Sequence, residues 1–196
     1  PDWWPPTFNE SKNFILGMQE VVEDIYMILY NPPHAKVLLS LEEISLLKQS
    51  VQNLVGIKCA GGDEQWYSQR RELLDDFSVF VPGHTVVYGK PLGANGSYSN
   101  VACLSPNGAV KIWDLIEKDY EKAQELEAKV LNFMKQYILP FANKLSNTGL
   151  DKLLASVGGW GPVSEKVLWP YDGATTEDVK KIKIHANNEL EEILNV

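Results

Sequence analysis

Hydrophobic runs alternate with amphipathic segments along the first half of the chain. Residues 25–30, 54–57 and 77–81 are nearly continuous apolar runs, and 97–103 is a fourth, weaker one. Apolar runs without polar alternation are typical of strands covered on both faces of a parallel sheet. The intervening segments 8–24, 41–51, 63–74 and 85–92 carry apolar residues at helical spacing. The pattern therefore predicts successive β/α units with a parallel sheet.

Polar residues mark where several of these helices begin. Ser40 is followed three residues later by Glu43, which is the signature of a capping box. Ser11 is the predicted N-cap of the first helix, and Asp63 opens the third. Pro32 and Pro33 end the first strand, because proline lacks the backbone N–H that a strand needs.

The second half of the chain has a different pattern. After Ser105-Pro106 the sequence predicts only helices, over 107–117, 119–139, 147–157 and 175–194. Four parallel strands followed by helices suit a small doubly wound sheet. They equally suit half of a (β/α)8 barrel, which needs roughly 250 residues in all. Periodicity alone leaves both organisations open.

Composition narrows the classes of function. The 196 residues include 26 acidic and 18 basic side chains, a net charge of −8, which argues against nucleic acid or an anionic membrane as a partner. The sequence has no apolar stretch long enough to span a membrane. Two cysteines and three histidines show no metal-ligand spacing, and no nucleotide-binding fingerprint is present. We therefore expect neither a metal nor a cofactor.

Two reactive side chains end neighbouring predicted strands. Lys58 ends the run 54–57, and Tyr30 ends the preceding one. Active sites of α/β folds lie at the carboxyl ends of the strands, where a neutral lysine can attack a ketone and a tyrosine can relay a proton. Each residue also has a purely structural interpretation. Lys58 is then a strand-end lysine whose amine extends into solvent, and Tyr30 is an aromatic side chain that closes the end of a barrel. The presence of both residues at the same end of neighbouring strands favours a catalytic role for the pair.

Further candidates surround this pair. Asn31, His34 and Lys36 follow Tyr30 in a loop where substrate would enter. Gly83 follows the third run and either lets a substrate carboxylate approach the backbone or only makes a turn. Tyr98 belongs to the fourth run. These five are the predicted substrate-binding residues.

Two segments resemble the dihydrodipicolinate synthase/N-acetylneuraminate lyase family of class I Schiff-base aldolases. They are Ile28–Pro33, a Tyr-Asn-x-Pro motif, and Leu54–Lys58, which ends in Gly-Ile-Lys. The separation of 28 residues between Tyr30 and Lys58 also fits the family. Residues 81–83 and 93–101 are similar to the family's loop after strand seven and its eighth strand.

The resemblance implies a (β/α)8 TIM barrel of which this sequence carries strands five to eight. It assigns residues 1–118 to the C-terminal half of the barrel and 119–196 to a C-terminal helical extension. The first four strands, with the loop that binds the substrate carboxylate, would be absent. We then expect exposed strand edges, and either missing residues, a second chain, or an unstable and inactive fragment.

The resemblance also implies a lyase or aldolase that acts on pyruvate or another 2-oxo acid. Lys58 would form the Schiff base and Tyr30 would serve as acid/base. His34-Ala35-Lys36 stands where lysine-pathway synthases carry an arginine, and Trp3 or Trp4 replaces a tyrosine supplied by a neighbouring subunit. The alternatives are a sugar-acid dehydratase of the same family and a non-catalytic 2-oxo-acid or sugar-acid binding protein. A cytoplasmic homo-oligomer, dimer or tetramer, is implied.

Overall fold

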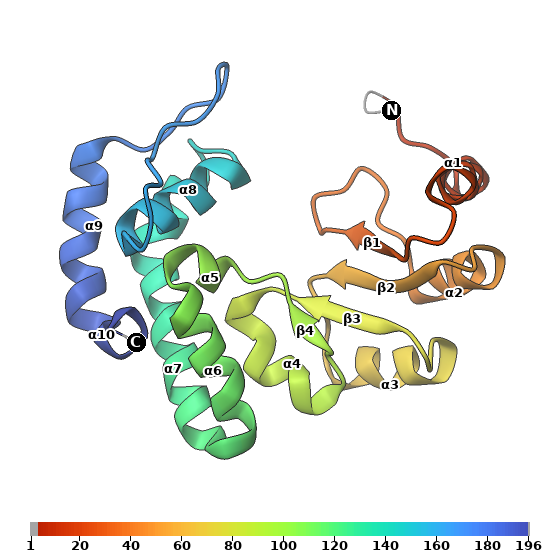
Figure 1. The fold of residues 1–196 in the computed structure, drawn as a ribbon, viewed down its shortest axis with the longest axis horizontal. Helices are drawn as coiled ribbons and strands as arrows, with labels where there is room; N and C mark the ends of the chain where they lie inside the picture. The colour runs from red at the N-terminus through yellow and green to blue at the C-terminus, as the bar shows by residue number, and fades with distance from the viewer. Residues whose placement is uncertain (1–3, 196) are drawn as a thin grey trace. The chain divides into compact units, whose positions relative to one another are not determined.

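A computed structural model describes residues 4–195, and its elements are shown in Figure 1. These residues form two compact units, one of 4–81 with 89–97 and the other of 82–88 with 98–195. Each unit is described by itself. Trp3, one of the two tryptophans predicted to replace a tyrosine, lies outside the described residues, whereas Trp4 is exposed. The predicted division between 1–118 and 119–196 stays a prediction.

The first unit is built on a parallel four-stranded sheet. Its strands pair in the order β1-β2-β3-β4, and all three pairings are parallel, as the sequence pattern predicts. Helices α2 and α3 pack on this sheet, and their apolar side chains join the strands in one core. The bounds are α1 Phe8–Val22, β1 Met27–Asn31, α2 Leu41–Ser50, β2 Leu54–Cys59, α3 Glu64–Leu73, β3 Ser78–Val81 and β4 Gly96–Ser97.

The predicted N-caps are correct for α2 and α3 but wrong for α1. Ser40 accepts from the Glu43 N–H while the Glu43 carboxylate accepts from the Ser40 N–H, and Asp63 accepts from the Trp66 N–H. The cap of α1 is Thr7 rather than Ser11, because Thr7 and Glu10 form the reciprocal capping box. The cap therefore lies four residues before the predicted one, while the helix begins at Phe8, where the predicted segment 8–24 also begins.

The fourth strand is much shorter than predicted. Residues 97–103 were expected to be extended, yet β4 covers only Gly96–Ser97, and Asn100–Leu104 forms helix α5. The reason is local, because the Ser99 hydroxyl accepts a hydrogen bond from the Ala102 N–H and so caps a helix at this point. A serine side chain that satisfies a free N–H favours a helix start over a strand.

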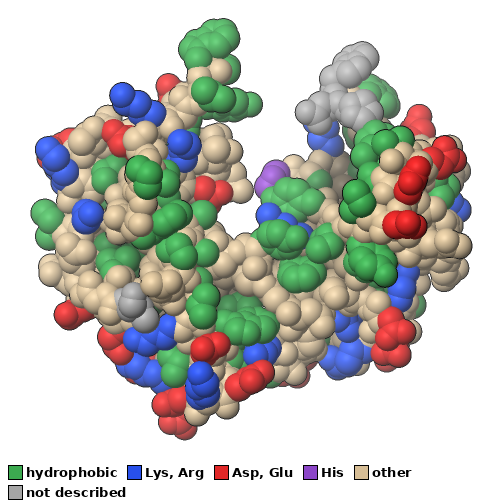
Figure 2. All heavy atoms as spheres, in the orientation of Figure 1, with side chains coloured by type: hydrophobic (Ala, Val, Ile, Leu, Met, Phe, Trp, Pro, Cys, Tyr) green, Lys and Arg blue, Asp and Glu red, His purple; other side chains and the backbone are tan. Residues whose placement is uncertain are grey.

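Strand β1 is not covered on both faces, contrary to the pattern-based prediction. Its residues alternate in exposure, with Ile28 38% and Tyr30 51% exposed. The exposed Ile28 and Tyr30 side chains project from the same face of β1, so that face is the uncovered one. β1 also lies at the edge of the sheet, with β2 as its strand partner among residues 4–195. Figure 2 shows hydrophobic side chains on the surface of the part of the molecule that carries α1 and β1. Phe14 and Val21 of α1 are among the exposed large hydrophobic residues.

Gly56 lets β2 approach β3 closely, and we predict that Gly56→Ala destabilises the protein. A Cβ at this position would lie 2.8 Å from the Ser78 carbonyl oxygen, a backbone atom that cannot rotate away. We expect the free energy of unfolding to fall by about 1–3 kcal/mol, as in other overpacked cores. Urea unfolding measures this difference.

Gly17→Ala is the matched control, because a Cβ there would meet no atom within 4 Å. Gly17 lies inside helix α1, where alanine is the better helix former, so stability should stay equal or rise by up to ~1 kcal/mol. Equal stability of Gly56→Ala and the wild type would show that β2 and β3 lie farther apart than described.

The second unit is helical apart from its turns. Pro106–Lys118 forms α6, with Ser105 as N-cap, and the predicted helix 119–139 divides into α7 and a π-helical turn. The division of the units falls within α4, Val86–Leu92, which follows a 3-10 turn at Gly83–Thr85. The remaining bounds are α5 Asn100–Leu104, α7 Tyr120–Phe133, π-turn Met134–Ile138, 3-10 turn Leu139–Phe141, α8 Asn147–Gly158, α9 Thr176–Glu189 and α10 Glu191–Leu194.

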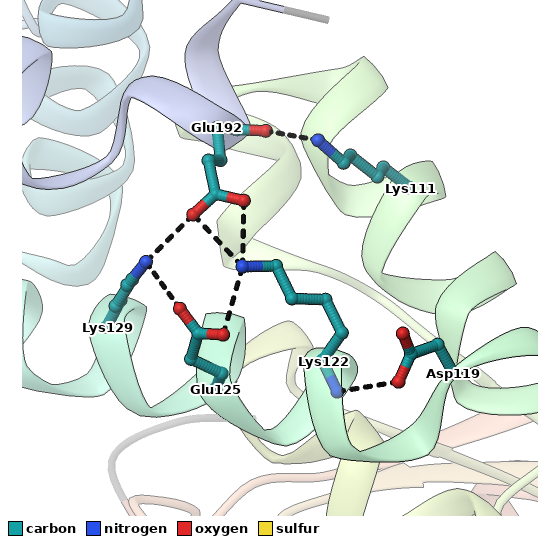
Figure 3. A network of polar contacts seen from close by, with 6 residues as sticks. All are labelled: Lys111, Asp119, Lys122, Glu125, Lys129 and Glu192. Atoms are coloured by element: carbon teal, nitrogen blue, oxygen red, sulfur yellow. Dashed lines mark hydrogen bonds and ion pairs between the residues drawn. The ribbon is translucent and has the colours of Figure 1, made fainter.

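A network of ion pairs joins α10 to α7 (Figure 3). Glu192 lies 2.9 Å from the Lys122 ammonium and 2.8 Å from that of Lys129, and Glu125 lies 2.7 Å from Lys129. Hydrogen bonds from these lysines, Lys129 first, lower the pKa of Glu192 to about 2. Hydrogen bonds to Glu125 and Glu192 raise the pKa of Lys129 to about 12. The network holds the C-terminal helix on the surface of its own unit.

We predict that Glu192→Gln lowers the melting temperature at pH 7 and low salt. Because folding lowers the pKa of Glu192, its stabilising contribution is complete above pH 4.5 and is lost as the pH falls toward 2. The difference from the wild type should therefore vanish below about pH 2, and it should shrink in high salt. Glu191→Gln, on the same helix, is the control that should melt like the wild type. A difference that persists in acid would contradict this account.

Candidate active site

Tyr30 and Lys58 stand side by side at the carboxyl ends of β1 and β2. The two residues are direct partners in the parallel register, so their side chains project from the same face of the sheet. The Lys58 Nζ lies 4.2 Å from the centre of the Tyr30 ring. The structure thus brings together the two residues that the sequence singled out, and the amine lies against the ring face.

This arrangement combines a primary amine with a phenol on one exposed face. A tyrosine ring attracts an ammonium through its quadrupole, which restricts where the Lys58 side chain can go. Half of the Tyr30 surface is exposed, so a ligand can reach the pair. An amine of this kind can add to a carbonyl group, and a nearby phenol can exchange a proton with the substrate oxygen.

The loop after β1 supplies further side chains next to this pair. The His34 ring contacts the Tyr30 ring in a T-shaped arrangement, with centroids 6.4 Å apart and planes at 76°. Lys36 is exposed on the same loop. Asn31 was expected to face a ligand, but it is buried. Its side-chain nitrogen donates a hydrogen bond to the Leu39 carbonyl, and its side-chain oxygen accepts one from the Leu39 N–H. No sequence motif signals this contact.

Gly83 and Tyr98 belong to the second unit and are described separately. Gly83 is buried in the 3-10 turn, and a side chain there would overlap Ser99, so close packing requires a glycine. Tyr98 precedes the cap of α5 and is half exposed. His84 and Asn100 of the same unit are hydrogen-bonded through their side chains. The substrate contacts of Gly83 and Tyr98 remain predictions.

The cysteines are poor candidates for catalysis. Cys59 points to the opposite side of the sheet from Lys58, as strand alternation predicts, and lines a cavity of about 340 Å3 with Ile44 and Trp66. Burial raises the pKa of the Cys59 thiol. The pKa of the Cys103 thiol is also raised, mainly by burial and secondly by the negative charge of Asp151. A thiol with a raised pKa stays protonated and is a weak nucleophile.

Two further observations concern metals and membranes. Among residues 4–195, no group of three or more histidine, cysteine and acidic side chains is placed to hold a metal ion. Within the same residues, every helix is too short or too polar to cross a bilayer.

Known proteins resemble this chain in both sequence and fold. A family model described as "Dihydrodipicolinate synthetase family" matches residues 1–186. The chain is 33% identical over 106 residues to a 4-hydroxy-tetrahydrodipicolinate synthase of Teredinibacter turnerae, an overlap that covers 53% of this chain and 36% of that protein.

Solved structures with TIM-barrel folds match nearly the whole chain. An N-acetylneuraminate lyase from Fusobacterium nucleatum superposes with a TM-score of 0.76 at 17% identity, covering 96% of this chain and 63% of that one. A dihydrodipicolinate synthase from Bacteroides thetaiotaomicron gives a TM-score of 0.76 at 20% identity, covering 96% and 64%. The chain therefore spans less than two thirds of the length of these proteins, and its four-stranded parallel sheet corresponds to part of their barrel.

Proposed function

Since the chain belongs to the dihydrodipicolinate synthetase family, we propose that it provides the Schiff-base site of a class I lyase acting on pyruvate or another 2-oxo acid. The observation that carries the proposal is the pairing of Tyr30 with Lys58 in register, with the amine 4.2 Å from the ring centre. These two residues are the proposed catalytic residues. The relatives named as lyase and synthase support the same class of reaction.

The proposed chemistry starts with the uncharged amine of Lys58. Its lone pair adds to the carbonyl carbon of the 2-oxo acid, the nitrogen loses a proton and the carbonyl oxygen takes one up, which gives a carbinolamine. Loss of water, which requires protonation of that hydroxyl, then gives the protonated Schiff base. The Tyr30 phenol is the proposed proton donor and acceptor in these steps. The cationic Schiff base accepts, as an enamine, the electron pair left at the neighbouring carbon when its bond to the next carbon breaks or when it loses a proton. In a dehydratase that enamine would then expel the hydroxyl group of the next carbon, which takes up a proton and leaves as water.

The proposal extends to the place of this sheet in a complete barrel. The Tyr-Asn-x-Pro and Gly-Ile-Lys motifs assign β1 and β2 to strands five and six, and β3 and β4 then correspond to strands seven and eight. Lys36, on the loop after β1 in the first unit, is proposed to contribute to substrate binding. Gly83 and Tyr98, which belong to the second unit, stay predictions as substrate-binding residues. The proposed working form is a cytoplasmic homo-oligomer, a dimer or a tetramer.

Reduction of the Schiff base tests the proposal. The protein is incubated with pyruvate, with a longer 2-oxo acid or with a sugar-derived 2-oxo acid, and then with borohydride, which delivers a hydride to the C=N bond. We expect mass spectrometry to find the reduced adduct on a peptide that contains Lys58. Absence of an adduct with every acid in the panel would overturn the proposal.

Product analysis and calorimetry separate the alternatives within the family. Aldolase activity releases an aldehyde from a substrate with a longer carbon chain, whereas a dehydratase releases water and leaves the carbon chain whole. A non-catalytic binding protein would bind the acid in calorimetry without an adduct and without turnover, and Lys58→Ala would leave its affinity unchanged.

A further inference from the structure

The loop between β1 and α2 is closed by the side chain of one buried residue. The Asn31 Nδ2 donates a hydrogen bond of 2.9 Å to the Leu39 carbonyl, and its Oδ1 accepts one of 3.1 Å from the Leu39 N–H. Only 6% of the Asn31 surface is exposed. This pair of bonds, the Asn31 clamp, joins the two ends of the loop 32–38.

The loop itself has little freedom once its ends are joined. Pro32 and Pro33 have restricted backbone angles, and the Ala35 N–H donates a hydrogen bond of 2.9 Å to the Pro32 carbonyl. The clamp and this turn together define where the residues between them lie. His34 is the residue that this turn carries against Tyr30.

His34 in turn contacts the ring on which the lysine rests. Its centroid lies 6.4 Å from that of Tyr30, and the Lys58 Nζ lies 4.2 Å from the same Tyr30 ring. Half of the Tyr30 surface is exposed to solvent, so these two contacts bear on where its ring lies. The order of contacts therefore runs from the buried amide of Asn31 through the loop and His34 to Tyr30 and Lys58.

We propose that Asn31 and His34 are positioning residues, which hold the Tyr30 ring where it orients the Lys58 amine. This inference rests on the proposed function. The positioning role replaces the expectation that Asn31 binds substrate, since the nitrogen and the oxygen of its side-chain amide are both hydrogen-bonded to Leu39. It also assigns His34 a role through its ring rather than through its charge.

The rate of adduct formation at saturating pyruvate tests the clamp. Displacement of a reacting group by about 1 Å costs up to about 100-fold in rate, so Asn31→Ala should lower the maximal trapping rate by roughly 10- to 100-fold. The half-saturating pyruvate concentration should change far less. Asn31→Asp keeps the oxygen that accepts from the Leu39 N–H and should retain an intermediate rate. Asn13→Ala, an exposed asparagine on α1, is the control expected to trap like the wild type.

Two substitutions of His34 separate contact from charge. His34→Phe keeps a ring that can meet Tyr30 but has no titratable nitrogen, whereas His34→Ala removes the ring. We expect the phenylalanine variant to retain most of the trapping rate with an unchanged pH profile and the alanine variant to lose about as much as Asn31→Ala. Equal losses in the two His34 variants would overturn the positioning role of the ring.

Hydrogen exchange at the Leu39 amide provides a readout that does not depend on the reaction. Asn31→Ala should exchange this hydrogen faster than the wild type, while His34→Ala should leave it protected. Unchanged exchange in Asn31→Ala, in protein that circular dichroism shows to be folded, would overturn the clamp. If the wild type forms no adduct, the proposed function fails, but the exchange result still decides the clamp.

Discussion

Lys58→Ala is expected to abolish the borohydride-reduced adduct and to lower any lyase turnover by on the order of 10³-fold or more, since the covalent route disappears. The fold should persist, because Lys58 is only partly buried at the end of β2. Intact-protein mass spectrometry after reduction measures the first effect, and product formation measures the second.

Two lysine variants make this result specific. Lys58→Arg keeps a positive charge beside the Tyr30 ring but is never a nucleophile at neutral pH, so it should also form no adduct. Lys48→Ala is the matched control, because Lys48 likewise lies over an aromatic ring, that of Phe77, at 5.8 Å. An adduct that survives in Lys58→Ala and disappears in Lys48→Ala would assign the Schiff base to Lys48 and contradict the proposal.

Tyr30→Phe is expected to lower turnover by about 10²- to 10⁴-fold, the usual contribution of a positioned acid/base group. The phenylalanine ring still offers a face to the Lys58 amine, so the adduct should form more slowly but remain detectable. Tyr30→Leu removes both the phenol and the ring and should lose more than Tyr30→Phe. Steady-state rates and the time course of trapping separate these two contributions.

Tyr26→Phe is the control for this pair of variants. Tyr26 is more exposed than Tyr30 and lies just before β1, so removal of its hydroxyl should change neither rate. Equal turnover of Tyr30→Phe and the wild type would remove the proton-transfer role from Tyr30 and leave only the contact of its ring with Lys58.

The elements whose structure follows from local chemistry were predictable from the sequence. The Ser40–Glu43 capping box and the Asp63 cap form as expected, because a side chain and a backbone N–H three residues apart need no distant partner. The same local chemistry explains the error at 97–103. Ser99 caps α5 with its hydroxyl, and that bond outweighs the weak apolar pattern that favoured a strand.

The candidate site was predictable to the extent that topology determines it. Residues that end neighbouring parallel strands meet at one edge of a sheet, so the positions of Tyr30 and Lys58 in the sequence already implied their proximity. The apolar pattern of 25–30 did not predict that β1 is exposed, because such a run looks alike in a covered strand and in an uncovered one. The family resemblance did predict exposed strand edges, since it implied that the first four strands are absent.

By itself, the sequence determined the β/α alternation, the parallel sheet and the pairing of an amine with a phenol at its carboxyl end. These depend on residue spacing and on the alternation of strand faces, which are properties of neighbouring residues. Only the tertiary structure decided that the amine rests on the ring face and that Asn31 bonds to Leu39 rather than facing a ligand. The reason is physical, because a buried amide binds whichever backbone groups folding brings within reach, and no spacing rule encodes that choice.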